Sequence, residues 1–321
     1  MADSELCIID IQRMSTEDGP GLRTTVFFKG CNLACPWCHN PESINKKPDL
    51  IWYSDKCAGC GACMDACPQK GISRDGEGLS FNRPLCLACG SCAEECPGAA
   101  IELKGRTLTV QKLAAELVKD KAYFGADGGI TLSGGEAMIQ HEAALRLAQA
   151  LKKEGINVAL DTAGCYDFRL LEAMLPYVDT ILYDIKIFDK EAHKRLTGAD
   201  NSIILDNYRR LAEKAAGGRP RIWVRTPIIE GATDNAENIA AIGEFLASIR
   251  SDASVGNGKS RPPEKWELCA FNNLCRDKYK RLDLEWAYRE TGLTEKAHII
   301  KLTEIARSYV PGAEYSGSVR E

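Results

Sequence analysis

The sequence predicts an α/β fold: a partial (β/α)6 barrel of the TIM type with a small cysteine-rich domain inserted into it. Six short apolar runs alternate with segments of helical periodicity, which indicates a parallel sheet with crossover helices. Six strands are fewer than the eight of a closed barrel, so the barrel should be open. The alternation stops within residues 48–105, where eight of the 15 cysteines fall. We therefore assign residues 1–47 and 106–321 to the barrel and residues 48–105 to the insert.

The barrel elements follow in chain order. The expected strands are Thr24–Lys29, Gly129–Leu132, Asn157–Leu160, Thr180–Ile185, Arg221–Ile228 and Trp266–Phe271. The expected helices are Val110–Val118, Ala143–Leu151, Phe168–Leu175, Ile204–Ala215, Ile239–Ile249 and Glu295–Ser308. Residues 251–263, rich in Ser, Gly and Pro, read as a flexible surface loop. Polar and cysteine residues follow the first four strands, so a site is expected at the carboxyl ends of the strands.

Composition limits the classes of function. The chain has 321 residues, 45% of them hydrophobic, enough for a sizeable core and about two domains. The net charge of −4 provides no basic field for nucleic acid, so a small molecule or a protein is the favoured partner. The N-terminus has no secretion signal and no apolar run is long enough to cross a bilayer. We expect a cytoplasmic protein whose cysteines bind metal rather than form disulfides.

The cysteines of the insert form two matching runs that begin 29 residues apart, at Cys57 and Cys86. Each has the spacing C-x2-C-x2-C-x3-C-P of bacterial ferredoxins, in which three thiolates ligate one 4Fe-4S cluster and the fourth ligates the other. The predicted sets are Cys57, Cys60, Cys63 and Cys96 for one cluster, and Cys86, Cys89, Cys92 and Cys67 for the other. A pair of structural zinc sites is the alternative, which the two proline-closed runs disfavour.

A third group, Cys31, Cys35 and Cys38, has no fourth cysteine nearby. A cubane held by three thiolates leaves one iron open for a small molecule. The alternative is a zinc site completed by His39. The single cysteines Cys7, Cys165, Cys269 and Cys275 are interpreted as buried or incidental thiols, and His141, His193 and His298 as core or surface residues without metal-pair spacing.

The spacing C-x3-C-x-aromatic-C resembles the signature of radical S-adenosylmethionine (SAM) enzymes. Together with DGPGxR at Asp18–Arg23 and SGGE at Ser133–Glu136, the whole chain resembles the glycyl radical enzyme activating enzymes, including those with a two-cluster ferredoxin insert. The resemblance implies that a cluster on Cys31, Cys35 and Cys38 cleaves SAM to a 5′-deoxyadenosyl radical. That radical would abstract hydrogen from one glycine of a partner enzyme.

The resemblance also implies roles for individual residues. The SAM contacts would be Trp37, His39, Ser133, Gly134, Gly135, Glu136, Asp161, Asp184, Lys186, Arg225 and Asn272. A monovalent cation could lie near Asp161 and Asp184. Asn272 stands where the best-known activases have a histidine, and it cannot titrate near neutral pH. The partner contacts would be Asp18, Gly19, Pro20, Gly21 and Arg23.

One expected partner is a glycyl radical enzyme, whose C-terminal glycine loop is the substrate. The other is a flavodoxin or ferredoxin that donates electrons. The protein itself is expected to be a monomer. The insert clusters either relay electrons or serve a structural role. The ferredoxin insert points away from pyruvate formate-lyase as the partner. There are two alternative functions. One is a radical SAM enzyme that acts on another peptide or small molecule, which the DGPG string disfavours. The other is a multi-cluster electron-transfer protein, which the presence of SGGE beside a three-cysteine cluster disfavours.

Overall fold

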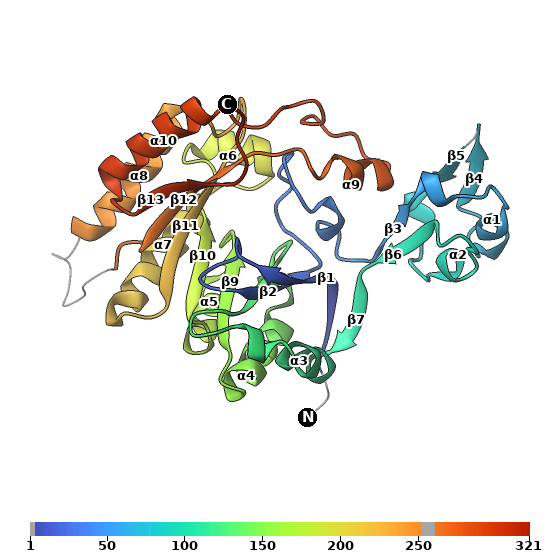
Figure 1. Cartoon of the computed structure of the whole chain (residues 1–321), viewed down its shortest axis with the longest axis horizontal. Helices are drawn as coiled ribbons and strands as arrows, with labels where there is room; N and C mark the ends of the chain where they lie inside the picture. Colours follow the sequence, from blue (N-terminus) through green and yellow to red (C-terminus); the bar gives the residue numbers. More distant parts are fainter. Residues whose placement is uncertain (1–3, 77, 252–260) are drawn as a thin grey trace.

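The computed structural model describes residues 4–76, 78–251 and 261–321, so most of the expected loop at 251–263 lies outside the described residues. Its centre is a nine-stranded sheet in the order β13-β12-β11-β10-β9-β8-β2-β1-β7 (Figure 1). The strands of this sheet are β1 Glu5–Ser15, β2 Arg23–Phe28, β7 Arg106–Thr109, β8 Gly129–Gly134, β9 Asn157–Thr162, β10 Thr180–Asp184, β11 Arg221–Ile228, β12 Lys265–Ala270 and β13 Ala313–Ser316.

The predicted α/β class with a mostly parallel sheet is confirmed. The six expected strands appear as β2, β8, β9, β10, β11 and β12, each parallel to its neighbour. Three further strands were not predicted: β13 adds a parallel strand at one edge, while β1 and β7 pair antiparallel at the other. β1 was missed because polar residues such as Asp10 and Gln12 interrupt its apolar pattern.

Helices lie along the outside of the curved sheet (Figure 1). They are α3 Val110–Val118, α4 His141–Lys153, α5 Phe168–Met174, α6 Lys190–Thr197, α7 Ser202–Lys214, α8 Ala236–Ser251 and α10 Lys296–Tyr309. The short helix α9 Arg276–Arg281 lies elsewhere, in the segment after β12, where it contacts the turn at Pro41–Ser43. The six expected helices agree with α3, α4, α5, α7, α8 and α10 to within a few residues. Their apolar faces and the sheet form one continuous core. In the described part of the chain, no helix has both the length and the hydropathy needed to cross a membrane.

The inserted segment forms a separate body with its own small core (Figure 1). It contains two short antiparallel pairs, β3 Asp49–Trp52 with β6 Ile101–Lys104 and β4 Ile72–Asp75 with β5 Gly78–Phe81, and the helices α1 Ala62–Ala66 and α2 Ser91–Glu94. Both helices begin after a left-handed glycine, Gly61 and Gly90, which are 29 residues apart. The 29-residue sequence repeat is therefore also a repeat of backbone conformation.

The DGPG string lies at the amino end of β2, the end opposite to the loop that carries Cys31, Cys35 and Cys38. Arg23 is fully buried and donates hydrogen bonds to Thr131 Oγ1 (2.6 Å), the Ile130 carbonyl (2.8 Å) and the Pro20 carbonyl (3.0 Å). Burial lowers its pKa to about 10.

This placement corrects part of the expected partner surface. Arg23, Gly19 and Pro20 are buried, so they are not available to a partner, while Asp18 is half-buried and Gly21 exposed. Arg23 instead fastens the turn before β2 to the neighbouring strand β8.

We expect Arg23→Met to lower the free energy of unfolding of the apoprotein by about 3 kcal/mol, because three buried acceptors lose a charged donor. Arg13→Met is the matched control: this arginine on β1 is 45% exposed and pairs with Asp120, so its loss should cost less than about 1 kcal/mol. Urea titrations of the two variants measure the difference, and equal losses would contradict the role given to Arg23.

Candidate functional site

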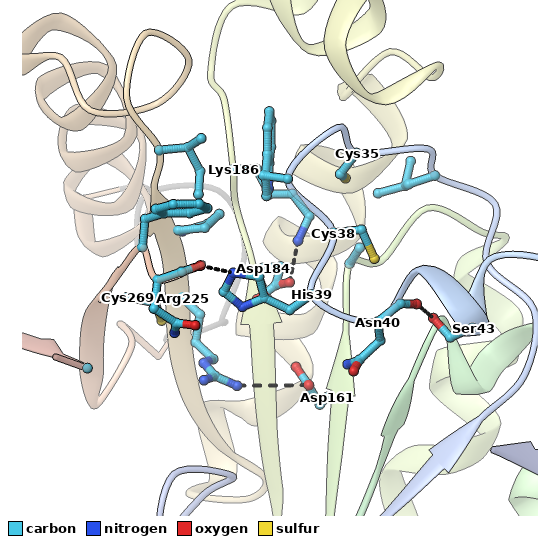
Figure 2. A pocket seen from close by; sticks show the side chains of 18 of the residues that line it. Cys35, Cys38, His39, Asn40, Ser43, Asp161, Asp184, Lys186, Arg225 and Cys269 are labelled. Carbon is cyan, nitrogen blue, oxygen red and sulfur yellow. Dashed lines mark hydrogen bonds and ion pairs between the residues drawn. The ribbon is translucent and has the colours of Figure 1, made fainter. Parts of the chain in front are cut away.

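A cavity of about 780 Å³ opens at the carboxyl ends of the parallel strands (Figure 2). Its size is within the range of small-molecule sites. Its wall contains residues from the ends of β8, β9, β10, β11, β12 and β13 and from the loop after β2. The predicted residues that line it are Cys31, Cys35, Trp37, Cys38, His39, Gly134, Gly135, Asp161, Asp184, Lys186, Arg225 and Asn272.

One end of the cavity carries the three thiols of the loop after β2. Burial raises the pKa of Cys31 to about 11 and that of Cys38 to about 12, and it also raises the pKa of Cys35. Without a metal the three thiols are therefore protonated at neutral pH. Binding a positively charged iron centre would release these protons and stabilise the thiolates.

Two glycines bring this loop against β8. Gly135 donates its N–H to the Phe28 carbonyl (3.0 Å), and Glu136 donates to the Gly30 carbonyl (2.8 Å). A Cβ on Gly134 would lie 2.2 Å from the Phe28 nitrogen, and one on Gly135 would lie 2.4 Å from the Gly30 oxygen. The glycines are thus required by contact between two backbones of this chain, in addition to any approach by a ligand.

The cavity wall also carries paired charges, and Figure 2 shows two of the pairs, Lys186 with Asp184 and Arg225 with Asp161. Arg225 Nη1 lies 3.8 Å from Asp161 Oδ2, and Arg225 Nε lies 3.2 Å from Glu267 Oε2. Lys186 Nζ is bonded to the Asp184 carboxylate. Burial raises the pKa of Asp161 to about 6, an effect that Arg225 opposes.

The pKa of Lys186 is raised as well. Burial would lower it, but the adjacent carboxylate of Asp184 outweighs that effect. This cation therefore keeps its charge at neutral pH.

Aromatic and amide groups form a further part of the cavity wall. His39 Nε2 lies 2.9 Å from the backbone oxygen of Asn272, and the His39 ring packs against Phe271 with centroids 5.8 Å apart. Burial lowers the pKa of His39, so its ring is neutral. The side-chain oxygen of Asn272 accepts from the Leu274 N–H (3.2 Å), so this side chain also holds its own loop.

Two residues expected at the site do not line the cavity. Ser133 donates to Asp161 Oδ2 (2.6 Å) and so positions a residue that does. Glu136 is buried and accepts from Thr162 Oγ1 (2.9 Å) and the Ala163 N–H (3.0 Å). Its carboxylate joins the segment after β8 to the end of β9, where its partners Thr162 and Ala163 line the cavity.

Sequence reasoning missed several lining or supporting residues. Glu267 and Cys269 lie two positions apart on β12 and therefore share one face of the sheet; Cys269 lines the cavity and Glu267 contacts Arg225. The alternation of side chains between the two faces of β12 could have identified both residues from the sequence. Glu17 and the segment 316–318 also line the cavity, but the segment follows β13, a strand that was not predicted.

In the insert, the cysteines gather in two sets. One cavity is lined by Cys57, Cys60, Cys63 and Cys96, and a second by Cys67, Cys86, Cys89 and Cys92. Each set combines three cysteines of one run with the last cysteine of the other. The repeat extends to hydrogen bonds, since Gly71 N donates to Cys67 Sγ (3.4 Å) as Ala100 N does to Cys96 Sγ (3.2 Å). Among the described residues no group of three or more His, Cys, Asp or Glu is arranged around a single metal ion. A four-iron cluster places its thiolates farther apart than one ion does, so the cysteine sets are considered for clusters.

Comparison with known proteins gives one family. Residues 25–242 match the model of the radical SAM superfamily. The chain is 39% identical over 250 residues to the indoleacetate decarboxylase activating enzyme of Tractidigestivibacter scatoligenes, covering 75% of this chain and 78% of that protein. It is 35% identical over 306 residues to the trans-4-hydroxy-L-proline dehydratase activating enzyme of Clostridioides difficile, covering 94% of this chain and 95% of that one.

Among solved structures, SuiB of Streptococcus suis bound to its precursor peptide SuiA matches with a TM-score of 0.50 and 12% identity. The match covers 89% of this chain and 46% of that one. At this identity the likeness concerns the fold alone.

The Glu136 carboxyl gives a prediction about pH. Burial raises its pKa from 4.5 to about 7. The unfolded chain releases this proton near pH 4.5 and the folded chain near pH 7, so the contribution of Glu136 to stability falls as the pH rises through that window. Glu136→Gln should remove this pH-dependent loss, which lowers the free energy of unfolding by about 3 kcal/mol at most. Urea titration of the two apoproteins from pH 4.5 to 8 measures it. Parallel stability curves would show that Glu136 ionises normally.

Proposed function

The chain belongs to the radical SAM superfamily and, within it, to the activating enzymes of glycyl radical enzymes, and from that membership we propose how its residues act. Cys31, Cys35 and Cys38 hold a 4Fe-4S cluster with one open iron, and SAM binds beside it. When bound, the reduced cluster and SAM supply a 5′-deoxyadenosyl radical that takes hydrogen from a glycine of the partner. The observation that carries this function is one cavity whose wall brings together three thiols and two pairs of opposite charges.

The charged residues suit the methionine part of SAM, which carries a carboxylate and an amino group. Glu267 holds the Nε side of Arg225, and Nη1 makes only a long contact with Asp161 (3.8 Å), so the two Nη groups could bind the carboxylate as a fork. Asp184 holds the ammonium of Lys186 within reach of further polar groups of SAM. The carboxylates of Asp161 and Asp184 would also bind a monovalent cation.

The wall residues suit the adenosine and the glycine. His39 and Trp37 flank the adenine; Trp37 is only 5% exposed and brings an apolar surface that excludes water. Asn272 hydrogen-bonds to adenosine through its amide. The partner's glycine loop enters from the open side of a partial (β/α)6 barrel, and a residue without a side chain fits such a site. Asp18 and Gly21 are the partner contacts that burial leaves accessible.

We further propose that the insert is a ferredoxin-like domain with two more 4Fe-4S clusters, which makes three in the protein. What supports the crossed ligand sets is that Cys96 shares a cavity with Cys57, and Cys67 shares one with Cys86. A flavodoxin or ferredoxin supplies electrons, and the protein works as a cytoplasmic monomer. The partner belongs with the enzymes that relatives of this chain are named as activating, which include an indoleacetate decarboxylase, a trans-4-hydroxy-L-proline dehydratase and a choline trimethylamine-lyase.

The protein, reconstituted anaerobically with iron and sulfide and reduced with dithionite, should convert SAM to 5′-deoxyadenosine. Arg225→Lys should raise the KM for SAM about 10- to 100-fold, because a lysine cannot make the paired hydrogen bonds. Arg221→Lys is the matched control on the same strand; its partner is Glu264, outside the cavity, and the KM should not change. Absence of SAM cleavage, with and without a glycyl radical partner, would refute the proposed function.

The insert clusters have a separate test. Cys63→Ala and Cys96→Ala should each remove the iron of the same cluster, because these two thiols face one cavity. If the insert relays electrons, reduction of the SAM-binding cluster by flavodoxin slows in both variants, while reduction by dithionite does not. Cys7→Ala serves as the control, since this thiol lies outside all three cysteine groups. Unchanged flavodoxin kinetics would leave the insert clusters a structural role only.

A further inference from the structure

The loop that carries Cys31, Cys35 and Cys38 has little regular structure of its own. Within the loop, Cys38 N donates to the Cys35 carbonyl (3.1 Å), and from outside, the Thr197 carbonyl accepts from Ala34 N (2.8 Å). Backbone carbonyls that secondary structure does not satisfy need other donors when they are shielded from water. In this loop, donors come from a segment more than 230 residues later in the chain.

That segment is 275–286, which contains α9 and which we name the clasp. The hydroxyl of Tyr279 donates to the Cys38 carbonyl (2.9 Å), and the indole N–H of Trp286 donates to the Pro36 carbonyl (2.9 Å). Both acceptors are backbone groups on or beside the cysteines. The contacts therefore fix the loop whatever side chains stand between the cysteines.

The two donors are held rigidly. The rings of Tyr279 and Trp286 stack with centroids 4.9 Å apart and an interplanar angle of 10°, and each residue is 7% exposed. They share an apolar cluster with Trp37 of the loop and Phe271. Side chains already fixed by packing lose little entropy when they make a hydrogen bond, so their bonds to the loop are more favourable than those of mobile groups.

Lys278 fixes the far end of the same loop. Its ammonium lies 2.7 Å from Glu42 Oε1 and 2.7 Å from Asn40 Oδ1. Glu42 is only 6% exposed, and from the opposite side its backbone carbonyl accepts from Lys29 Nζ (2.6 Å). The end of the loop is thus held between a buried lysine of the barrel and a lysine of the clasp.

We propose that the clasp is a positioning element that holds the cysteine loop in its ligand geometry before any cluster is bound, with Tyr279 and Trp286 as positioning residues. This inference rests on the proposed cluster at Cys31, Cys35 and Cys38. The clasp follows β12, the last strand predicted from the sequence, and it holds the loop that follows β2, the first one. A loop arranged in advance loses less entropy when iron binds.

The test uses hydrogen–deuterium exchange of the full-length apoprotein, read on the peptide that covers residues 31–40. Tyr279→Phe and Trp286→Phe each remove one donor and keep an aromatic ring. Each should speed exchange of this peptide about fivefold, the factor that corresponds to about 1 kcal/mol for one hydrogen bond. Tyr288→Phe is the matched control: its ring packs on the same cluster, and its hydroxyl has no hydrogen bond to a described residue.

Exchange in peptides from β9 and β10 shows whether a variant has lost its fold. An unchanged rate at residues 31–40 in both variants would overturn the proposal, as would an equal rise in Tyr288→Phe or in the strand peptides. The holoprotein gives a second readout, because a chelator should remove the cluster with the SAM-dependent electron paramagnetic resonance signal faster from Tyr279→Phe. Since exchange is measured without cluster or SAM, its outcome is independent of whether the wild-type protein cleaves SAM.

Discussion

The site depends on one close contact between two backbones. At Gly134 and Gly135 the end of β8 lies directly against the end of β2, with two hydrogen bonds across the contact and no space for a Cβ. Because β2 leads directly into Cys31, this contact sets where the cysteine loop leaves the sheet. The remaining carboxyl ends of the parallel strands then face that loop across a single cavity.

The cavity combines groups that favour opposite charges. Burial favours protonated thiols, whereas the cations Arg225 and Lys186 in the same cavity are each balanced by carboxylates. An iron centre would supply the positive charge that the thiols lack, and a zwitterionic amino acid group matches the mixed charges of the wall. The cavity suits neither a wholly apolar nor a wholly anionic ligand, which is consistent with the family to which the chain belongs.

Local patterns in the sequence predicted much of this. Strands such as β8 and β10 could be predicted because both faces are covered, which leaves nearly uninterrupted apolar runs, whereas β11 could be predicted from its alternation. The three cysteines and the charged residues at strand ends followed from motif spacing. The hydrogen-bond partners of Arg23 and of the Glu136 carboxylate could not be predicted in this way, because only the fold brings them together. The contacts of the segment 275–286 could not be predicted, because they are made with a loop more than 230 residues earlier in the chain.

The geometry of the insert also bears on how such a chain could have arisen. Asp49 and Lys104 are paired neighbours in the β3–β6 ladder, so the chain leaves and re-enters the barrel at adjacent points. Paired positions in an antiparallel ladder lie about 5 Å apart. A piece of sequence with such closely placed ends can be gained or lost by a single genetic event without displacing the strands on either side. Its 29-residue repeat in backbone conformation suggests that the insert itself began as a duplicated half.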